Sequence, residues 1–181
     1  MGNKRTYSIP FVGLKPGVHL FEYHIEDSFF EEYGEQDFSN CKANVKLNLE
    51  KNVGFMQLKF DIDGHVDVGC DRCGNPLNKA LWDEFTIIVK LVDNPEEMNM
   101  QEEDPDIFYL GRTESHLQIE NWLFEFVTLS IPNQRTCNEE EFKGPLCNVE
   151  VLHKLQQMEE EVKKAANPLW KGLENFKQKD N

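Results

Sequence analysis

The sequence has no long apolar run and no leader of the secretory type. Lys4 and Arg5 near the N-terminus are not followed by an apolar stretch, so the pattern of a secretory signal peptide is missing. No segment approaches the ~18 consecutive apolar residues that a membrane-spanning helix requires. We therefore expect a cytoplasmic protein with no membrane partner.

Basic charge is scarce. The 181 residues include 19 Lys and Arg against 33 Asp and Glu, which gives a formal net charge of −14. Nucleic-acid affinity comes largely from Lys and Arg contacts to phosphate, so an acidic chain is a poor general nucleic-acid binder. Strong acidity instead suits solubility and contact with basic proteins, of which ribosomal proteins are one class.

Motifs of the common enzyme classes are also missing. The sequence contains no Gly-rich phosphate loop, no Gly-x-Ser-x-Gly elbow and no paired-His metalloprotease motif. The histidines are scattered without a local cysteine partner, and no carboxylate pair has an informative spacing. No small-molecule substrate is indicated, and we expect a protein that is not an enzyme.

Five cysteines are present, an odd number in a chain without an export signal, so a disulfide framework is not expected. Cys70 and Cys73 form a Cys-x-x-Cys pair followed by Gly74, and this spacing lets two thiolates bind one zinc ion in a tight turn. Structural zinc takes four ligands, and Cys137 and Cys147 could supply the other two. Free thiols and a redox pair are the alternatives. A redox pair normally begins a helix, whereas the residues after Cys73 favour a turn.

The first half of the chain has the alternation of a β-sheet. Apolar and polar residues alternate over 41–70, with turn signals at 52–54 and at Asp63-Gly64. Residues 19–25 alternate in the same way, and 81–92 is typical of a central strand because both of its faces are partly apolar. These segments predict an antiparallel β-meander, with closure into a barrel as an alternative.

The second half has the periodicity of helices. Apolar residues at helical spacing predict a helix over 116–130, with Ser115 and Gln118 as a capping box at its start. A second helix is predicted over 149–166, and a short last helix is predicted from Pro168.

The predicted fold class is α+β, with a β-meander first and two to three C-terminal helices packed on it. We expect one domain spanning 1–181, with a frayed tail at 178–181. The segment 93–106 carries many acidic residues and no Lys or Arg, and we expect it to form a mobile acidic loop. It is either a solvated connector or a docking segment for a basic partner.

Three motifs in this order resemble those of the YceD family. Cys70–Leu77 resembles the cysteine knuckle of that family, Leu117–Pro132 its helix with a closing Leu-x-Leu-Pro, and Asn167–Leu173 its C-terminal Asn-Pro-x-Trp motif. Order and spacing agree over about residues 10–177. The resemblance implies a bacterial factor in ribosome biogenesis that supports accumulation of the large-subunit ribosomal RNA. It implies no known catalytic activity, and the family's domain, DUF177, has no mechanism that we can assign.

Candidate partner-binding residues lie in two of these motifs. They are Arg72 in the knuckle and Asn167, Pro168 and Trp170 near the C-terminus. The expected partner is a ribosomal protein or a precursor of ribosomal RNA. Two other functions stay open: an acidic protein-binding adaptor unrelated to ribosomal RNA, and a thiol-redox protein that uses the Cys-x-x-Cys pair.

Overall fold

The computed structural model describes residues 6–100, 104–137 and 147–164. Contacts divide the chain into two compact units. Unit 1 runs to Val68 and includes Pro76–Arg135, whereas unit 2 comprises Gly69–Asn75 and the chain from Thr136 onward. No helix within the described residues is long and apolar enough to cross a membrane.

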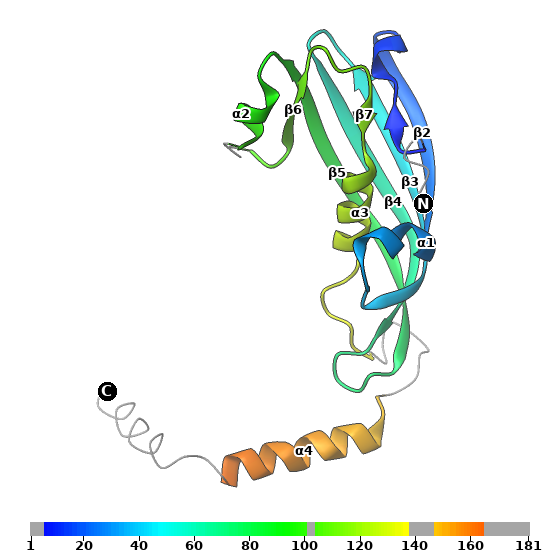
Figure 1. Ribbon diagram of the computed structural model, residues 1–181. Coiled ribbons are helices and arrows are strands. Elements are labelled where there is room, and N and C mark those ends of the chain that lie inside the picture. The colour runs from blue at the N-terminus through cyan, green and yellow to red at the C-terminus, as the bar shows by residue number, and fades with distance from the viewer. Residues whose placement is uncertain (1–5, 101–103, 138–146, 165–181) are drawn as a thin grey trace, which may run out of the picture. The chain divides into compact units, whose positions relative to one another are not determined.

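Unit 1 is built on a five-stranded, mostly antiparallel sheet with the strand order β2-β3-β4-β5-β6 (Figure 1). These strands are β2 (Gly17–Glu26), β3 (Phe38–Lys51), β4 (Phe55–Gly69), β5 (Pro76–Val92) and β6 (Ile107–Gly111). The last strand pairs with β5 in parallel. Because the order ends at β2 on one side and β6 on the other, the sheet is open and is not a barrel. A separate pair joins β1 (Ser8–Ile9) to β7 (Leu117–Gln118).

The α+β prediction and the strand predictions from alternation are confirmed, with one correction in β4. The chain turns between Lys51 and Phe55 as expected. Asp63-Gly64, however, was predicted as a turn and lies inside β4. Gly64 has φ +152°, and a Cβ there would lie 2.8 Å from the Cα of Ala43. The glycine therefore serves a close approach between β3 and β4, beside a register shift between Ser39 and Lys42.

The acidic segment 93–106 is not a loop throughout. It contains the short helix α2 (Pro95–Met100), and β6 follows directly after the segment. Neither element was predicted. Both are short, and β6 exists as a strand because its backbone pairs with β5, a partner that lies outside any local sequence window.

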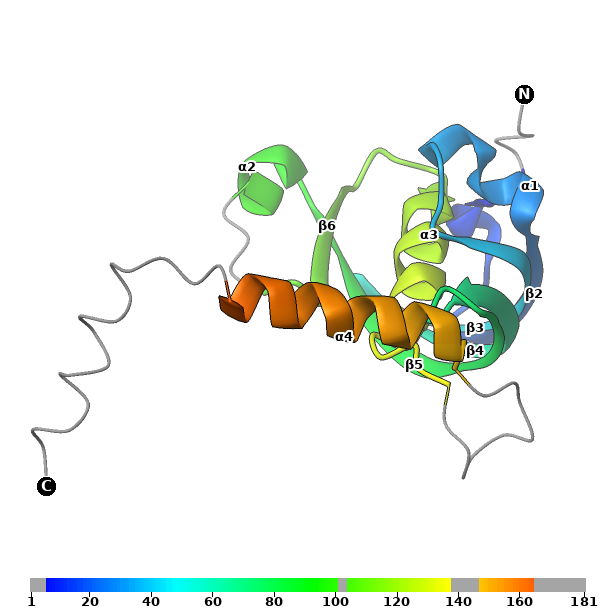
Figure 2. The same cartoon turned by 90° about the horizontal axis from the view of Figure 1, so that it is seen from below.

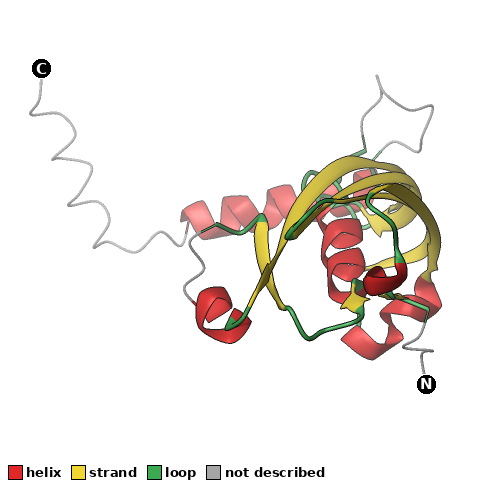
Figure 3. Cartoon of the chain, turned by 90° about the horizontal axis from the view of Figure 1, so that it is seen from above, coloured by secondary structure: helices red, strands yellow, loops and turns green. Residues whose placement is uncertain are grey.

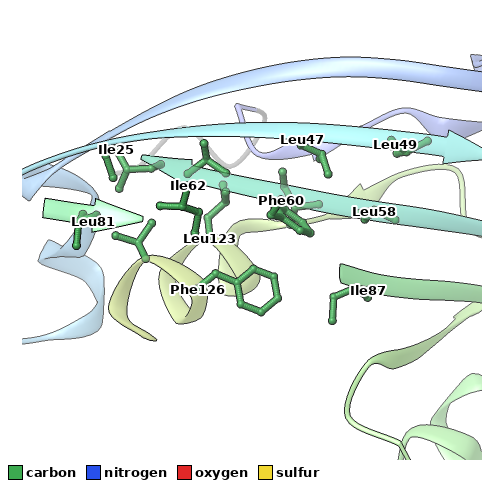
Figure 4. Packing of buried hydrophobic residues seen from close by; sticks show 14 of the residues in the cluster. Ile25, Leu47, Leu49, Leu58, Phe60, Ile62, Leu81, Ile87, Leu123 and Phe126 are labelled. Carbon is green, nitrogen blue, oxygen red and sulfur yellow. The ribbon is translucent and has the colours of Figure 1, made fainter. Parts of the chain in front are cut away.

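The sheet of unit 1 curves around helix α3 (Glu120–Leu129), which fills its concave side (Figures 2 and 3). Leu123 and Val127 are fully buried. Phe126 meets Phe60 edge-on with ring centroids 5.1 Å apart (Figure 4). Phe126 also stacks on Phe85, with ring centroids 4.4 Å apart. Alternate residues of β3 and β4 form the floor of this core: Val45, Leu47, Leu49, Met56, Leu58, Phe60 and Ile62. The apolar stripe predicted for this helix is therefore a packing surface.

The predicted start of that helix is wrong by several residues. Leu117 and Gln118 form strand β7 instead of a first turn, and the helix begins at Glu120. Ser115 and Gln118 do not form a capping box, because Gln118 donates from Nε2 to Ser8 Oγ and Ser115 hydrogen-bonds to His116. Pairing with the N-terminal strand outweighs the local capping signal.

Short helical segments complete unit 1, and α4 (Val149–Lys164) belongs to unit 2. The segments of unit 1 are the 3₁₀ turns η1 (Phe11–Gly13) and η2 (Glu31–Tyr33) and the helix α1 (Asp27–Phe30). Asn148 is the N-cap of α4, since its Oδ1 accepts the N–H groups of Glu150 and Val151 at 3.0 and 3.4 Å. The second predicted helix is confirmed over its described part. The helix predicted from Pro168 and the tail 178–181 lie outside the described residues.

Candidate metal centre

The Cys-x-x-Cys pair lies in a tight turn between β4 and β5. The N–H of Cys70 donates to the carbonyl of Asn75, and the N–H of Gly74 donates back to the carbonyl of Cys70, both at 2.8 Å. Gly74 has φ +74°, a left-handed conformation that glycine adopts without a steric penalty. The turn therefore holds the side chains of Cys70 and Cys73 close together.

Two further cysteines from much later in the chain complete the cluster. The sulfur atoms of Cys70, Cys73, Cys137 and Cys147 all lie within 4.8 Å of one another. The sulfurs of Cys73 and Cys137 are 3.8 Å apart. Metal–sulfur bonds of about 2.3 Å in a tetrahedral site place neighbouring sulfurs about 3.8 Å apart. The cluster therefore has dimensions compatible with a single metal ion.

The cluster is shielded from solvent and lies within one unit. Cys70 and Cys73 are 4% and 8% exposed, whereas Cys137 and Cys147 are half-buried. All four belong to unit 2, which also contains α4. None of the five cysteines of the chain is in a disulfide.

Electrostatics in the cluster favour a bound cation. Burial raises the pKa of the Cys70 thiol, but backbone N–H groups of Arg72, Cys137 and Cys73 together with the Cys137 thiol outweigh burial, and the pKa falls to about 6. Burial and the neighbouring cysteines raise the pKa of Cys137 to about 12, and burial also raises that of Cys147. One thiolate, that of Cys70, is thus stabilised by the turn together with Cys137, whereas further thiolates need a positive charge at the centre of the cluster.

The fifth cysteine is apart from this site. Cys41 is buried in β3, and burial followed by the charge of Asp27 raises its pKa to about 11. The carboxylate of Asp27 accepts the N–H groups of Asn40 and Cys41 at 2.9 and 2.7 Å. Cys41 is therefore a packing residue of the sheet.

The remaining candidate residues divide into two groups. Arg72 is exposed, and its backbone N–H is one of the donors to Cys70 sulfur. Asn167, Pro168 and Trp170 lie outside the described residues. Sequence patterns carry no sign of the N–H donors around Cys70, because every residue except proline has an N–H and only the folded turn aims it.

One comparison with known proteins returned a match. The family model described as "Large ribosomal RNA subunit accumulation protein YceD" matches residues 58–177. This range is well over half of the chain and includes all four clustered cysteines and α3. Comparisons with curated proteins and with solved structures found no match.

Proposed function

The chain belongs to the YceD family of large ribosomal RNA subunit accumulation proteins, and on this premise we propose that it is a non-catalytic factor in ribosome biogenesis. It supports accumulation of the large-subunit ribosomal RNA in the cytoplasm by contacting a ribosomal protein or a precursor of that RNA. Family membership over residues 58–177 is the observation that carries this proposal. The net charge of −14 supports a basic protein as the direct partner.

The proposal includes a structural zinc ion held by the four clustered cysteines. Zinc in a four-thiolate site has no open position for water or substrate, so such a site stabilises structure and does not catalyse. The N–H donors to Cys70 would support the charge of its thiolate beside the ion, as outer ligands of metal sites commonly do. With all four thiolates bound to metal, no free thiolate remains in the cluster for a thiol-redox activity, which is why we favour the structural role.

Elemental analysis of purified, untagged protein tests the zinc proposal. We expect about one zinc per chain, and loss of that zinc in Cys70→Ser. Cys41→Ala is the matched control, because Cys41 is buried outside the cluster and its removal should leave the zinc content unchanged. Wild-type protein without zinc, purified in the presence of added zinc, would refute this part of the proposal.

The ribosomal role is tested by ribosomal RNA profiles of a strain that lacks the protein. We expect the ratio of mature large-subunit to small-subunit RNA to fall, and to recover when the wild-type gene is returned. Returning Cys70→Ser should restore less RNA than Cys41→Ala does. An unchanged ratio in the deletion strain would overturn the proposed function.

A further inference from the structure

One margin of the sheet in unit 1 is open. β2 lies at this margin, and among the described strands its one partner is β3, in an unbroken register over its whole length (Figure 1). Within the described residues, no backbone hydrogen bond reaches its other side. In an edge strand, every second residue directs its N–H and C=O groups away from the sheet. β2 therefore offers a row of free donors and acceptors along ten residues that include no proline and no lysine.

The outer edge of β6, at the other end of the sheet, is covered by local contacts, whereas the outer edge of β2 is open. Asn99 of α2 donates from Nδ2 to the carbonyl of Tyr109 at 2.8 Å, and its Oδ1 accepts the N–H of Tyr109 at 2.9 Å. The N–H of Ile107 donates to Asp104, and the carbonyl of Gly111 accepts from Glu114. A side chain and two turns thus take the place of a neighbouring strand on β6, as expected of a protected edge.

Apolar side chains lie exposed beside the open edge. Val18 and Leu20 are 67% and 60% exposed and project from the same face of β2, two residues apart. Their neighbours on β3 are Glu50 and Asn48, which offer no apolar cover. A further strand would place side chains about 5 Å from both and remove them from water.

The charges on the same face of β2 favour basic residues in a strand added beside it. Glu22 lies opposite Lys46, which in turn lies opposite Asp61, so the charge alternates across β2, β3 and β4. Glu26 lies opposite Lys42 in the same way. Opposite charges on neighbouring strands attract and like charges repel, so the positions beyond Glu22 and Glu26 favour Lys or Arg.

We propose that the free edge of β2 binds an extended segment of a basic protein as a sixth strand of the sheet. Apolar side chains of the partner lie beside Val18 and Leu20, and Lys or Arg lies beside Glu22 and Glu26. A second copy of this chain is a poor occupant, because each copy carries a charge of −14 and would bring its own acidic β2 to the interface. The inference deepens the proposed function by giving its basic partner a binding site and a backbone conformation.

A designed peptide tests the site on the full-length protein. The peptide has nine residues and blocked ends, with lysine at its first and fifth positions, valine at its seventh and ninth, and threonine elsewhere. Bound antiparallel to β2, it places the lysines opposite Glu26 and Glu22 and the valines opposite Leu20 and Val18. We expect its addition to shift the NMR amide signals of Gly17–Glu26 and to slow hydrogen exchange at alternate residues there. A scrambled peptide of the same composition should bind more weakly.

Paired charge reversals locate the contact. Glu22→Lys with Glu26→Lys should weaken peptide binding about tenfold, because two attractive pairs become repulsive. Glu96→Lys with Glu97→Lys changes the net charge equally on α2, beside the closed edge, and should leave affinity within about twofold. Val18→Thr with Leu20→Thr should also weaken binding while leaving the charge unchanged. Amide spectra of each variant show that it remains folded.

Several outcomes would overturn the inference. The first two are the absence of any NMR shift at millimolar peptide and shifts that are confined to α2 and β6. The third is a larger loss of peptide affinity in the Glu96–Glu97 variant than in the Glu22–Glu26 variant. The fourth is a shift of the β2 signals on addition of a ribosomal RNA oligonucleotide but not of the peptide. Failure here is distinct from failure of the proposed function, because the ribosomal RNA ratio of the deletion strain does not depend on which surface binds the partner.

Discussion

At the residue scale, the backbone of Lys42 and Ala43 occupies the space where a side chain at position 64 would lie. The φ of +152° at Gly64 adds a conformation that other residues rarely adopt. We predict that Gly64→Ala lowers the free energy of unfolding by about 2–4 kcal/mol, because strain and steric overlap combine. Urea denaturation measures the change.

Gly54 is the control for that substitution. Its φ is +85°, yet a Cβ there would meet nothing within 4 Å. Gly54→Ala should therefore show only the conformational penalty, about 1 kcal/mol. Equal losses for the two variants would show that the contact with β3 contributes nothing.

The thiol of Cys41 predicts a pH dependence of stability. Burial raises its pKa from 9.0 to about 11 in the folded chain. The unfolded chain therefore loses this proton first as pH rises, and the stability due to the protonated thiol, fully present below pH 9, is lost progressively up to about pH 11. We expect the urea midpoint to fall more steeply between pH 9 and about pH 11 in wild type than in Cys41→Ala. If the urea midpoints of the two proteins fell in parallel with pH, the raised pKa of Cys41 would be contradicted.

At the scale of elements, α3 carries the same residue type on its two faces. Leu123 is fully buried against the sheet, and Leu129 is 59% exposed. Leu123→Ala should lower the free energy of unfolding by about 2–5 kcal/mol, through lost burial and the cavity left behind. Leu129→Ala should change it by less than about 0.5 kcal/mol. Thermal and urea unfolding of both variants measure the difference, and similar losses would mean that α3 does not pack as described.

The elements also show how far periodicity reaches. Alternation correctly predicts most of β2, β3 and β4, since each has one face that must be buried, and two partly apolar faces predict most of β5. It does not predict β6 or β7, whose few residues become strands only by pairing with distant partners. The false turn at Asp63-Gly64 has the same origin: a glycine required by tertiary contact is locally indistinguishable from one required by a turn.

At the scale of the whole molecule, the proposed zinc ion should stabilise unit 2 selectively. The four cysteines lie in that unit, whereas the core around Phe60 and α3 lies in unit 1. Removal of the metal with a chelator should therefore increase hydrogen exchange in 69–75 and α4 at least about tenfold, while β3 and β4 stay protected. Exchange measured by mass spectrometry distinguishes the two units.

Two results would contradict that prediction. A chelated protein in which β3 and β4 exchange as fast as α4 would mean that the ion stabilises the sheet as well. Unchanged exchange in 69–75 would mean that the cysteine turn does not depend on metal. The single-domain organisation over 1–181 stays a prediction, and the same exchange experiment bears on it, because a single cooperative domain loses protection everywhere together.

The sequence alone determined what depends on near neighbours. The alternation in 41–62, the periodicity of α3 and the turn after Cys73 each follow from residues a few positions apart, and the three motifs sufficed for the family. Only the tertiary structure decided what depends on distant partners. It brings Cys137 and Cys147 to Cys70 and Cys73 and leaves the edge of β2 open while Asn99 closes that of β6. The physical reason is that ligand geometry and strand pairing are properties of positions in space, which local propensity does not encode.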